Sequence, residues 1–207
     1  MTIRTIYFDY GGVIYKTPSL AGLNRWKRIL GLADDPEIME MLENPNESQF
    51  VKDMCLGKIP EDKVWTMMAE KWHIKPSMIR RLRRAMVSKR RLNTPMIDLM
   101  AELKEDYQTA ILSNAGDQTR ALMEDVFHLD QFVSEIIISA EEGVIKPDPQ
   151  IYQIAMDRLN AAPETSLFID DYLENVLAAR DFGMKAVQFI DNAQAVQAVR
   201  DHLAEEA

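Results

Sequence analysis

The sequence predicts an α/β fold: a Rossmann-like, doubly wound parallel sheet with an inserted α-helical cap domain. Two features of the chain predict it. Apolar runs rich in β-branched and aromatic residues alternate with helical segments over most of the chain, and one long stretch after the first run contains helical patterns alone. Because strands joined by single helices form βαβ units, the alternating part should form a parallel sheet covered by helices.

Five apolar runs are expected to form buried parallel strands, which read as near-continuous hydrophobic segments. They are residues 3–8, 107–112, 133–138, 167–169 and 186–190. Segments of helical periodicity separate the later runs. These are residues 94–104, 118–127, 149–159 and 173–182.

The stretch from about Lys16 to Arg91 breaks this alternation, because it has several helical patterns and no convincing strand. The helical patterns are at residues 20–30, 61–72 and 77–87. Asn93, Thr94 and Pro95 then restart the core with residues that favour the opening of a helix. We therefore expect a core at residues 1–15 and 92–207 and a helical cap at residues 16–91.

Composition limits the classes of partner. A chain of 207 residues is long enough for one domain with a modest insertion, and its net charge of −9 disfavours binding to nucleic acid or to an acidic membrane. Cys55 is the single cysteine, so no internal disulfide is expected. The first residues lack a secretory pattern, and no run approaches the roughly 20 apolar residues that cross a bilayer. A cytoplasmic location is expected.

Polar residues stand where the predicted strands end. Asp9, Ser113 and Asp171 follow three of the apolar runs, and Lys146 follows a fourth by a short connection. In open α/β sheets, ligands bind beyond the carboxyl ends of the strands. These residues should therefore face one crevice, which the helical cap is placed to cover.

Asp9 precedes two glycines, Gly11 and Gly12, at a sharp turn where a ligand can approach closely. A carboxylate in this position can be a covalent nucleophile. The alternative is a turn aspartate that accepts hydrogen bonds from local backbone N–H groups.

Ser113 and Asn114 end a strand just before a helix, so the hydroxyl and the neighbouring amides would point at a phosphate. The alternative, equally open from these residues, is that Ser113 is a plain turn residue and Asp117 the N-cap of the following helix. Lys146 lies between rigid proline-containing flanks in VIKPDPQIY, where a fixed ammonium could neutralise a phosphate. Its alternative is a solvated surface lysine.

Asp170 and Asp171 are consecutive acids at the end of an apolar run, and adjacent carboxylates there are costly unless a cation binds. Mg²⁺ fits best, because it takes oxygen ligands and bridges to substrate phosphate. Asn175, one helical turn further on, could support the ligand acid by a hydrogen bond. The alternative makes Asp171 a helix N-cap and Asn175 a surface residue.

The fragments FDYGGV, LSNA, IKP and FIDDYLEN, in this order, resemble the motifs of the haloacid dehalogenase (HAD)-like hydrolase superfamily, in the subgroup with a helical cap after the first motif. The resemblance implies the following roles. Asp9 is the nucleophile, Ser113 provides the phosphate-binding hydroxyl, and Lys146 is the cation that orients the phosphate. Asp9, Asp171 and the backbone carbonyl of Gly11 are the Mg²⁺ ligands, and Asp170 is a supporting acid.

Gly11 is also where the chain departs from most phosphatases of the superfamily, which carry a second aspartate there as general acid and base. Losing such a group typically costs about 10²–10⁴ in rate. A subgroup with glycine at this position and paired acids in the last motif is associated with sugar-phosphate phosphatases. The resemblance therefore implies a Mg²⁺-dependent phosphatase of a small phosphorylated metabolite. The alternatives are a haloacid dehalogenase and a catalytically degraded phosphate-binding or regulatory protein.

Overall fold

The structure is a computed structural model that describes residues 2–16, 24–25, 27–29, 48–87 and 91–204. Its centre is a five-stranded sheet with the strand order β3-β2-β1-β4-β5, and every neighbouring pair is parallel. The strands are β1 (Thr5–Phe8), β2 (Gln108–Ser113), β3 (Glu135–Ile138), β4 (Ser166–Asp170) and β5 (Lys185–Gln188). The predicted α/β fold with a parallel sheet is confirmed.

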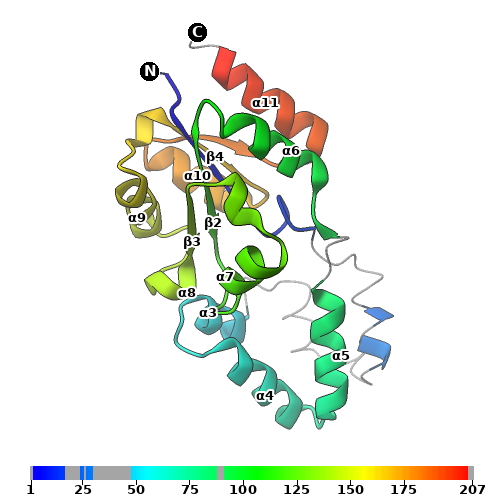
Figure 1. Cartoon of the computed structure of the whole chain (residues 1–207). Coiled ribbons are helices and arrows are strands. Elements are labelled where there is room, and N and C mark those ends of the chain that lie inside the picture. Colours follow the sequence, from blue (N-terminus) through cyan, green and yellow to red (C-terminus); the bar gives the residue numbers. More distant parts are fainter. Residues whose placement is uncertain (1, 17–23, 26, 30–47, 88–90, 205–207) are drawn as a thin grey trace.

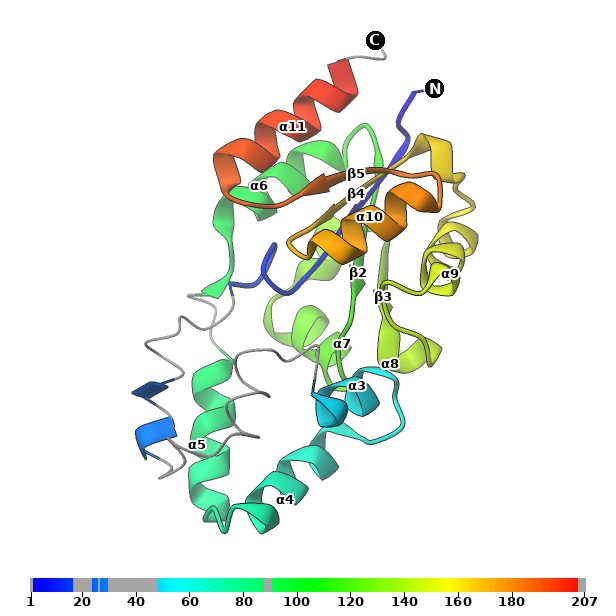
Figure 2. The same cartoon turned by 180° about the vertical axis from the view of Figure 1, so that it is seen from behind.

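Helices cover both faces of the sheet (Figures 1 and 2). Alternate residues of β1 point to opposite faces, so Ile6 and Phe8 belong to one apolar cluster and Tyr7 to the other. The first cluster includes residues of α6 (Thr94–Leu103), η2 (Leu122–Val126) and α11 (Asn192–Ala204). The second includes residues of α9 (Pro149–Leu159) and α10 (Leu173–Asp181). The central strands are therefore buried on both sides, which is why they read as continuous apolar runs.

The segment predicted as one helix over residues 118–127 differs from the prediction. It consists of a short α7 (Thr119–Ala121) followed by the π-helical η2, in which the Phe127 N–H donates to the Leu122 carbonyl, five residues back, at 3.1 Å. Five further elements were also not predicted. They are α3 (Gln49–Cys55), η3 (Leu129–Phe132), α8 (Ser139–Glu142), η4 (Pro163–Thr165) and α11.

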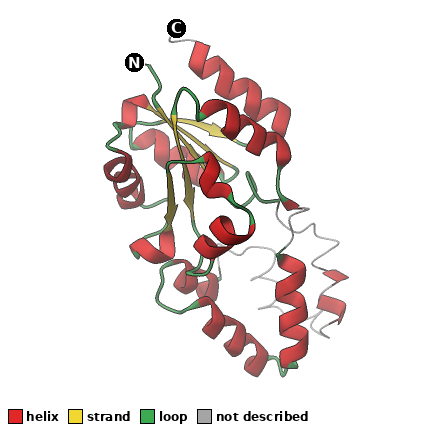
Figure 3. Ribbon diagram, viewed as in Figure 1, coloured by secondary structure: helices red, strands yellow, loops and turns green. Residues whose placement is uncertain are grey.

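Within residues 48–87 the regular secondary structure is entirely helical (Figure 3), as the cap prediction requires. The helices are α3 (Gln49–Cys55), α4 (Glu61–Lys71) and α5 (Pro76–Met86). They lie beyond the carboxyl ends of β2 and β3, and α3 is the one next to α7 and α8 (Figure 1). Of the helix predicted at residues 20–30, residues 24–25 and 27–29 are helical and the rest lies outside the described residues.

The segment that leaves the core after β1 and the segment that returns to it before α6 run side by side. The Lys16 N–H donates to the Arg91 carbonyl at 2.8 Å, and Nε of Arg91 donates back to the Lys16 carbonyl at 2.9 Å. The Arg91 guanidinium also lies over the Tyr15 ring, 5.3 Å from its centroid. The domain division at residues 16 and 91 stays a prediction, which this pairing of the two connections supports. In the described part of the chain, no helix is long and apolar enough to cross a membrane.

Residues of the core complete the ends of the cap helices. The residue before α4 is Pro60, whose side chain makes no capping hydrogen bond, and Oδ1 of Asp117 accepts from the Glu61 N–H at 3.0 Å instead. The hydroxyl of Ser139 donates to the Cys55 carbonyl at the end of α3 at 2.7 Å. The alternative role of Asp117, as N-cap of the helix that follows it, is wrong, because Gln118 occupies the N-cap position of α7.

We expect Asp117→Ala to destabilise α4 by about 1 kcal/mol, because the first turn of this helix then loses its side-chain acceptor. Urea unfolding gives the global effect, and amide hydrogen exchange over Glu61–Lys71 gives the local one. Asp98→Ala is the matched control, since Asp98 is an exposed acid on α6. Equal exchange rates in α4 for the two variants would show that Asp117 does not cap this helix.

Candidate active site

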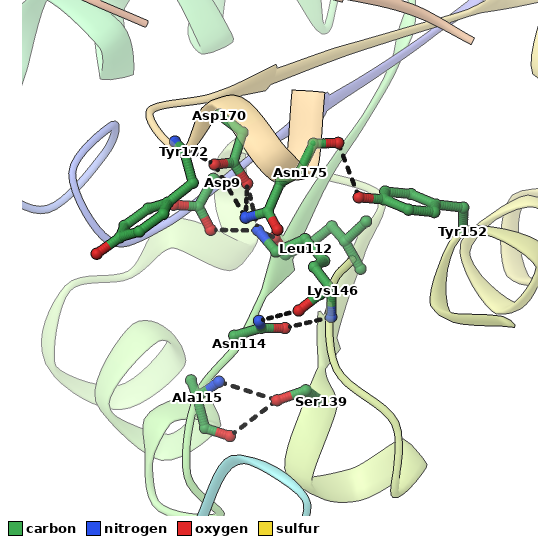
Figure 4. Close-up of polar contacts among 10 residues, drawn as sticks. All are labelled: Asp9, Leu112, Asn114, Ala115, Ser139, Lys146, Tyr152, Asp170, Tyr172 and Asn175. Carbon is green, nitrogen blue, oxygen red and sulfur yellow. Dashed lines mark hydrogen bonds and ion pairs between the residues drawn. The ribbon is translucent and has the colours of Figure 1, made fainter. Parts of the chain in front are cut away.

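The strand register brings the predicted site residues together at one edge of the sheet (Figure 4). Phe8 is level with Ile111 of β2 and with Ile169 of β4, so Asp9 emerges between the ends of these two strands. The Asp9 N–H donates to the Ile169 carbonyl at 2.8 Å, which continues the pairing by one residue. The carboxylate of Asp9, which follows the central strand β1, therefore stands beside Asp170, the last residue of β4.

Lys146 reaches this point from the connection between α8 and α9 and is almost completely buried, with 3% of its surface exposed. Its ammonium donates to Oδ1 of Asp9 at 2.6 Å, to Oδ2 of Asp170 at 2.7 Å and to the Leu112 carbonyl at 2.9 Å. An ammonium has three donors, and these contacts use all of them. The alternative of a solvated surface lysine is wrong.

The charge of Lys146 is secured by its neighbours. Burial alone would lower the pKa of the ammonium, but the negative charges of Asp170 and Asp9, with their hydrogen bonds, outweigh burial and raise it. Lys146 therefore remains a cation at neutral pH. A cation held in a site without water stabilises a developing negative charge more strongly than a cation in water does.

Three carboxylates lie around that one ammonium, and two of them contact it. Asp9, Asp170 and Asp171 each offer an oxygen, and these oxygens lie within 4.8 Å of one another. Burial, reinforced by Asp170 and Asp171 against the opposing effect of Lys146, raises the pKa of Asp9 to about 8. Burial and the charge of Asp170 raise the pKa of Asp171 to about 6. The site thus carries more negative charge than its lysine neutralises, and a second cation would relieve the excess.

Asp171 has the donor atom that such a cation needs. Its Oδ1 is buried and has no hydrogen-bond partner among the described residues. A buried carboxylate oxygen left unpaired is costly unless an ion or water satisfies it. The oxygen-only donor set and the unpaired oxygen fit a hard divalent ion such as Mg²⁺. The alternative role of Asp171 as a helix N-cap is not observed, because Tyr172 is the N-cap residue of α10.

The two glycines after Asp9 differ in what surrounds them. Gly12 has φ +85°, and a Cβ there would lie 2.1 Å from Oδ2 of Asp171, so the Asp171 carboxylate fills the space of a missing side chain. A Cβ at Gly11, in contrast, would have no heavy atom of the described residues within 4 Å. The role of the Gly11 carbonyl as a metal ligand stays a prediction.

Asp170 is fixed from several sides and is fully buried. Its Oδ1 accepts from the Tyr172 N–H at 2.7 Å, and the Asn175 amide donates to both of its oxygens, at 3.1 Å to Oδ1 and 3.0 Å to Oδ2. The carbonyl of Asn175 in turn accepts from the Tyr152 hydroxyl at 2.9 Å. Asn175 is therefore no surface residue, and the acid that it holds is Asp170.

Ser113 and Asn114 lie on the other side of Asp9, at the end of β2. Ser113 is its last residue and is buried. The Asn114 side chain faces the Lys146 backbone, with Oδ1 accepting from the Lys146 N–H at 2.8 Å and Nδ2 donating to the Lys146 carbonyl at 2.9 Å. The predicted contacts of Ser113 and Asn114 with a substrate phosphate stay predictions.

Sequence reasoning missed other polar groups of the site. Ser139 follows β3 directly and accepts from the Ala115 N–H at 3.0 Å, so the strand-end rule that singled out Asp9 would have found it. The Leu112 carbonyl and the Tyr172 N–H are backbone groups, which any residue type supplies, and the sequence carries no signal for them.

A cavity of about 170 Å³ adjoins this cluster between α3 and the core. Its walls combine cap residues, the loop after β2 and the start of α10. They are formed by Val51, Lys52, Cys55, Asn114, Ile145, Lys146, Pro147, Tyr172, Glu174 and Asn175.

Comparison with known proteins identifies the family. The pattern of the haloacid dehalogenase-like hydrolases matches residues 3–183. The chain belongs to this hydrolase family. Among solved structures, a predicted HAD-like family hydrolase from Porphyromonas gingivalis superposes with a TM-score of 0.77 at 23% identity, over 100% of both chains. A HAD family enzyme from Bacteroides thetaiotaomicron, in complex with magnesium and inorganic phosphate, has a TM-score of 0.74 at 18% identity, covering 90% of this chain and 93% of its own.

Relatives of the HAD-like chain have several activities. Bifunctional epoxide hydrolase 2 of Mus musculus is 30% identical over 95% of this chain, which spans 38% of that protein's length. Sesquiterpene phosphatase astK of Aspergillus oryzae is 26% identical, covering 92% of both proteins. (S)-2-haloacid dehalogenase 4A of Burkholderia cepacia is 32% identical over 40% of this chain and 36% of its own length.

We expect Gly12→Ala to displace the Asp171 carboxylate and to weaken Mg²⁺ binding at least about tenfold, as disturbance of a metal ligand's support typically does. Titration calorimetry with MgCl₂ measures the affinity. Gly143→Ala is the matched control, because Gly143 also has positive φ (+71°) but no described heavy atom within 4 Å of the added Cβ. Both variants carry the backbone strain of about 1–2 kcal/mol, and the prediction fails if both bind Mg²⁺ equally well.

Proposed function

We propose that this chain is a Mg²⁺-dependent phosphatase that acts on a small phosphorylated metabolite, such as a sugar phosphate, through an aspartyl-phosphate intermediate on Asp9. The observation that carries the proposal is the buried Lys146 ammonium between Asp9 and Asp170, with the unpaired oxygen of Asp171 beside them. The same cluster is suited to an anionic substrate and a divalent cation together, which is the requirement of phosphoryl transfer.

The metal would be held by Asp9, Asp171 and the backbone carbonyl of Gly11, with Asp170 and Asn175 supporting them. When bound, Mg²⁺ supplies positive charge that neutralises the phosphate oxygens. The three carboxylates are the side chains present that can ligate a cation, and their oxygens fit a hard divalent ion. The magnesium and phosphate bound to the Bacteroides thetaiotaomicron enzyme support this assignment.

The chain's own residues account for the two chemical steps. Lys146 holds Oδ1 of Asp9, so we assign Oδ2 as the nucleophile. This oxygen forms a bond to phosphorus while the bond from phosphorus to the substrate's ester oxygen breaks, and the ester oxygen leaves with the electron pair. Water then attacks the phosphorus, the bond to Asp9 breaks, and the carboxylate and inorganic phosphate are released. The ammonium of Lys146 neutralises part of the charge in both steps.

The substrate's leaving group would occupy the cavity next to Lys146. Apolar residues such as Val51 and Ile145 and charged residues such as Lys52 and Glu174 line this space.

Asp9→Asn should reduce turnover to background with the fold intact, because the amide keeps the size of the side chain but is a far poorer nucleophile. The assay is phosphate release from p-nitrophenyl phosphate and from a panel of phosphorylated metabolites, with Mg²⁺ or with EDTA. Asp98→Asn, which changes an exposed acid on α6, is the matched control and should keep the wild-type rate. Full activity of Asp9→Asn would refute the nucleophile, and full activity in EDTA would refute the metal requirement.

A haloacid dehalogenase is the second candidate, favoured by the absence of a side-chain acid at Gly11 and by the Burkholderia cepacia relative. Displacement of a halide by Asp9 needs no divalent ion. Halide release from 2-chloropropionate in EDTA, with no phosphate release from any ester, would favour this candidate over the phosphatase.

Gly11→Asp should raise the phosphatase kcat, by up to the 10²–10⁴ typical of a general acid and base, because no heavy atom of the described residues lies within 4 Å of the added Cβ. Gly11→Asn is the control, since it has the same size but cannot transfer a proton in this way. A large gain from a parent with no measurable activity would identify the chain as a degraded phosphate-binding protein. An unchanged kcat would mean that another group already carries the proton.

A further inference from the structure

The Asn114 side chain and the Lys146 backbone form a reciprocal pair across 32 residues of sequence (Figure 4). The Lys146 N–H donates to Oδ1 of Asn114 at 2.8 Å, and Nδ2 of Asn114 donates to the Lys146 carbonyl at 2.9 Å. A backbone N–H can only donate and a carbonyl can only accept, so these partners fix which way the amide faces. Both polar atoms of the Asn114 side chain are therefore engaged with a single residue.

Lys146 needs such an anchor. It lies in the turn between α8 and α9, so neither a helix nor a strand of the sheet fixes its backbone. Its side chain is long and loses rotamer entropy when the ammonium is held at one point. A flexible chain delivers its ammonium to one point only if both ends are fixed. The acceptors on Asp9, Asp170 and Leu112 fix the ammonium end, and Asn114 fixes the backbone end.

We propose that Asn114 is a positioning residue that places the Lys146 ammonium against Asp9 by anchoring the Lys146 backbone. The inference rests on the proposed phosphatase function for its catalytic consequence, but its structural claim can be tested without activity. This role does not require Asn114 to bind the substrate. The pair with Lys146 uses one of the two Nδ2–H donors of the amide, so the other N–H is not engaged in it.

The first test is the crystal structure of Asn114→Ala. The positioning role predicts that the Lys146 backbone shifts and that the contact of 2.6 Å between the ammonium and Oδ1 of Asp9 lengthens or is lost. An unchanged position of Lys146 would overturn the proposal, whether or not the chain is a phosphatase. Absence of phosphatase activity in the parent would instead refute the proposed function and leave this structural result standing.

The second test is a double-mutant cycle with Lys146→Ala, measured on the best phosphate ester at saturating Mg²⁺. Asn114→Ala alone should lower kcat by about 10²-fold, the cost of a displaced catalytic group, with KM nearly unchanged. In the Lys146→Ala background the same change should have no further effect. A raised KM, or an equal effect of Asn114→Ala in both backgrounds, would mean that Asn114 binds substrate independently of Lys146.

Two precautions keep the cycle interpretable. Thr109→Val removes one partly buried hydrogen bond, which the Thr109 hydroxyl donates to the Phe132 carbonyl at 2.8 Å. Thr109 lies near the start of β2, at the opposite end of the strand from Asn114. This variant should lower the thermal midpoint and leave kcat unchanged, which separates a general loss of stability from the positioning effect. If Lys146→Ala does not fold, Lys146→Arg takes its place, and the crystal structure of Asn114→Ala remains decisive.

Discussion

The structure depends on one buried ammonium shared by two carboxylates at the end of the central strand. Lys146 bonds Asp9 and Asp170 at 2.6 and 2.7 Å with almost no access to solvent. Burying charges of this kind costs several kcal/mol each, which only close contacts and further hydrogen bonds offset. The surrounding polar groups provide these bonds: the Leu112 carbonyl to Lys146, and the Tyr172 N–H and Asn175 amide to Asp170. The cluster is therefore a constraint on the fold as well as a centre for chemistry.

The order of the strands is what allows the cluster to form. The chain builds β1, β2 and β3 outward on one side and then crosses to β4 on the other side of β1, so the two neighbours of the central strand end next to Asp9. One of these neighbours contributes Leu112, the other contributes Asp170, and a connection after β3 delivers Lys146. The cap helices contact the same edge through Ser139, which also accepts from the Ala115 N–H, and through Asp117, which lies in the loop that carries Asn114. The site and the cap thus both contact the loop that follows β2.

The sequence predicted those parts of this arrangement that depend on a local pattern of residues. Asp9, Ser113 and Asp171 were found because each follows an apolar run, and the carboxyl ends of parallel strands share one edge. The partner of Asn175 was not predictable, since both Asp170 and Asp171 lie within its reach along the chain and only the packed structure selects Asp170. The capping of α4 by Asp117 joins residues 56 positions apart, and the break of residues 118–127 into α7 and η2 has no marker such as proline or glycine. These features arise from tertiary contacts that local propensity does not encode.

Gly11 and Gly12 are adjacent residues of the same type, but the structure requires glycine at only one of the two positions. At Gly12 the positive φ and the Asp171 carboxylate exclude any side chain, so this glycine maintains the proposed metal ligand. At Gly11 the described surroundings leave room for a side chain, so packing does not account for the absence of an acid next to the proposed nucleophile. The difference is therefore chemical rather than steric. In the proposed phosphatase, charge neutralisation by Lys146 and a divalent ion would leave less need for a proton donor when the leaving group is already a stable anion. The acidity of the leaving group is therefore the property by which phosphate esters should differ most in rate, with aryl phosphates ahead of alkyl phosphates.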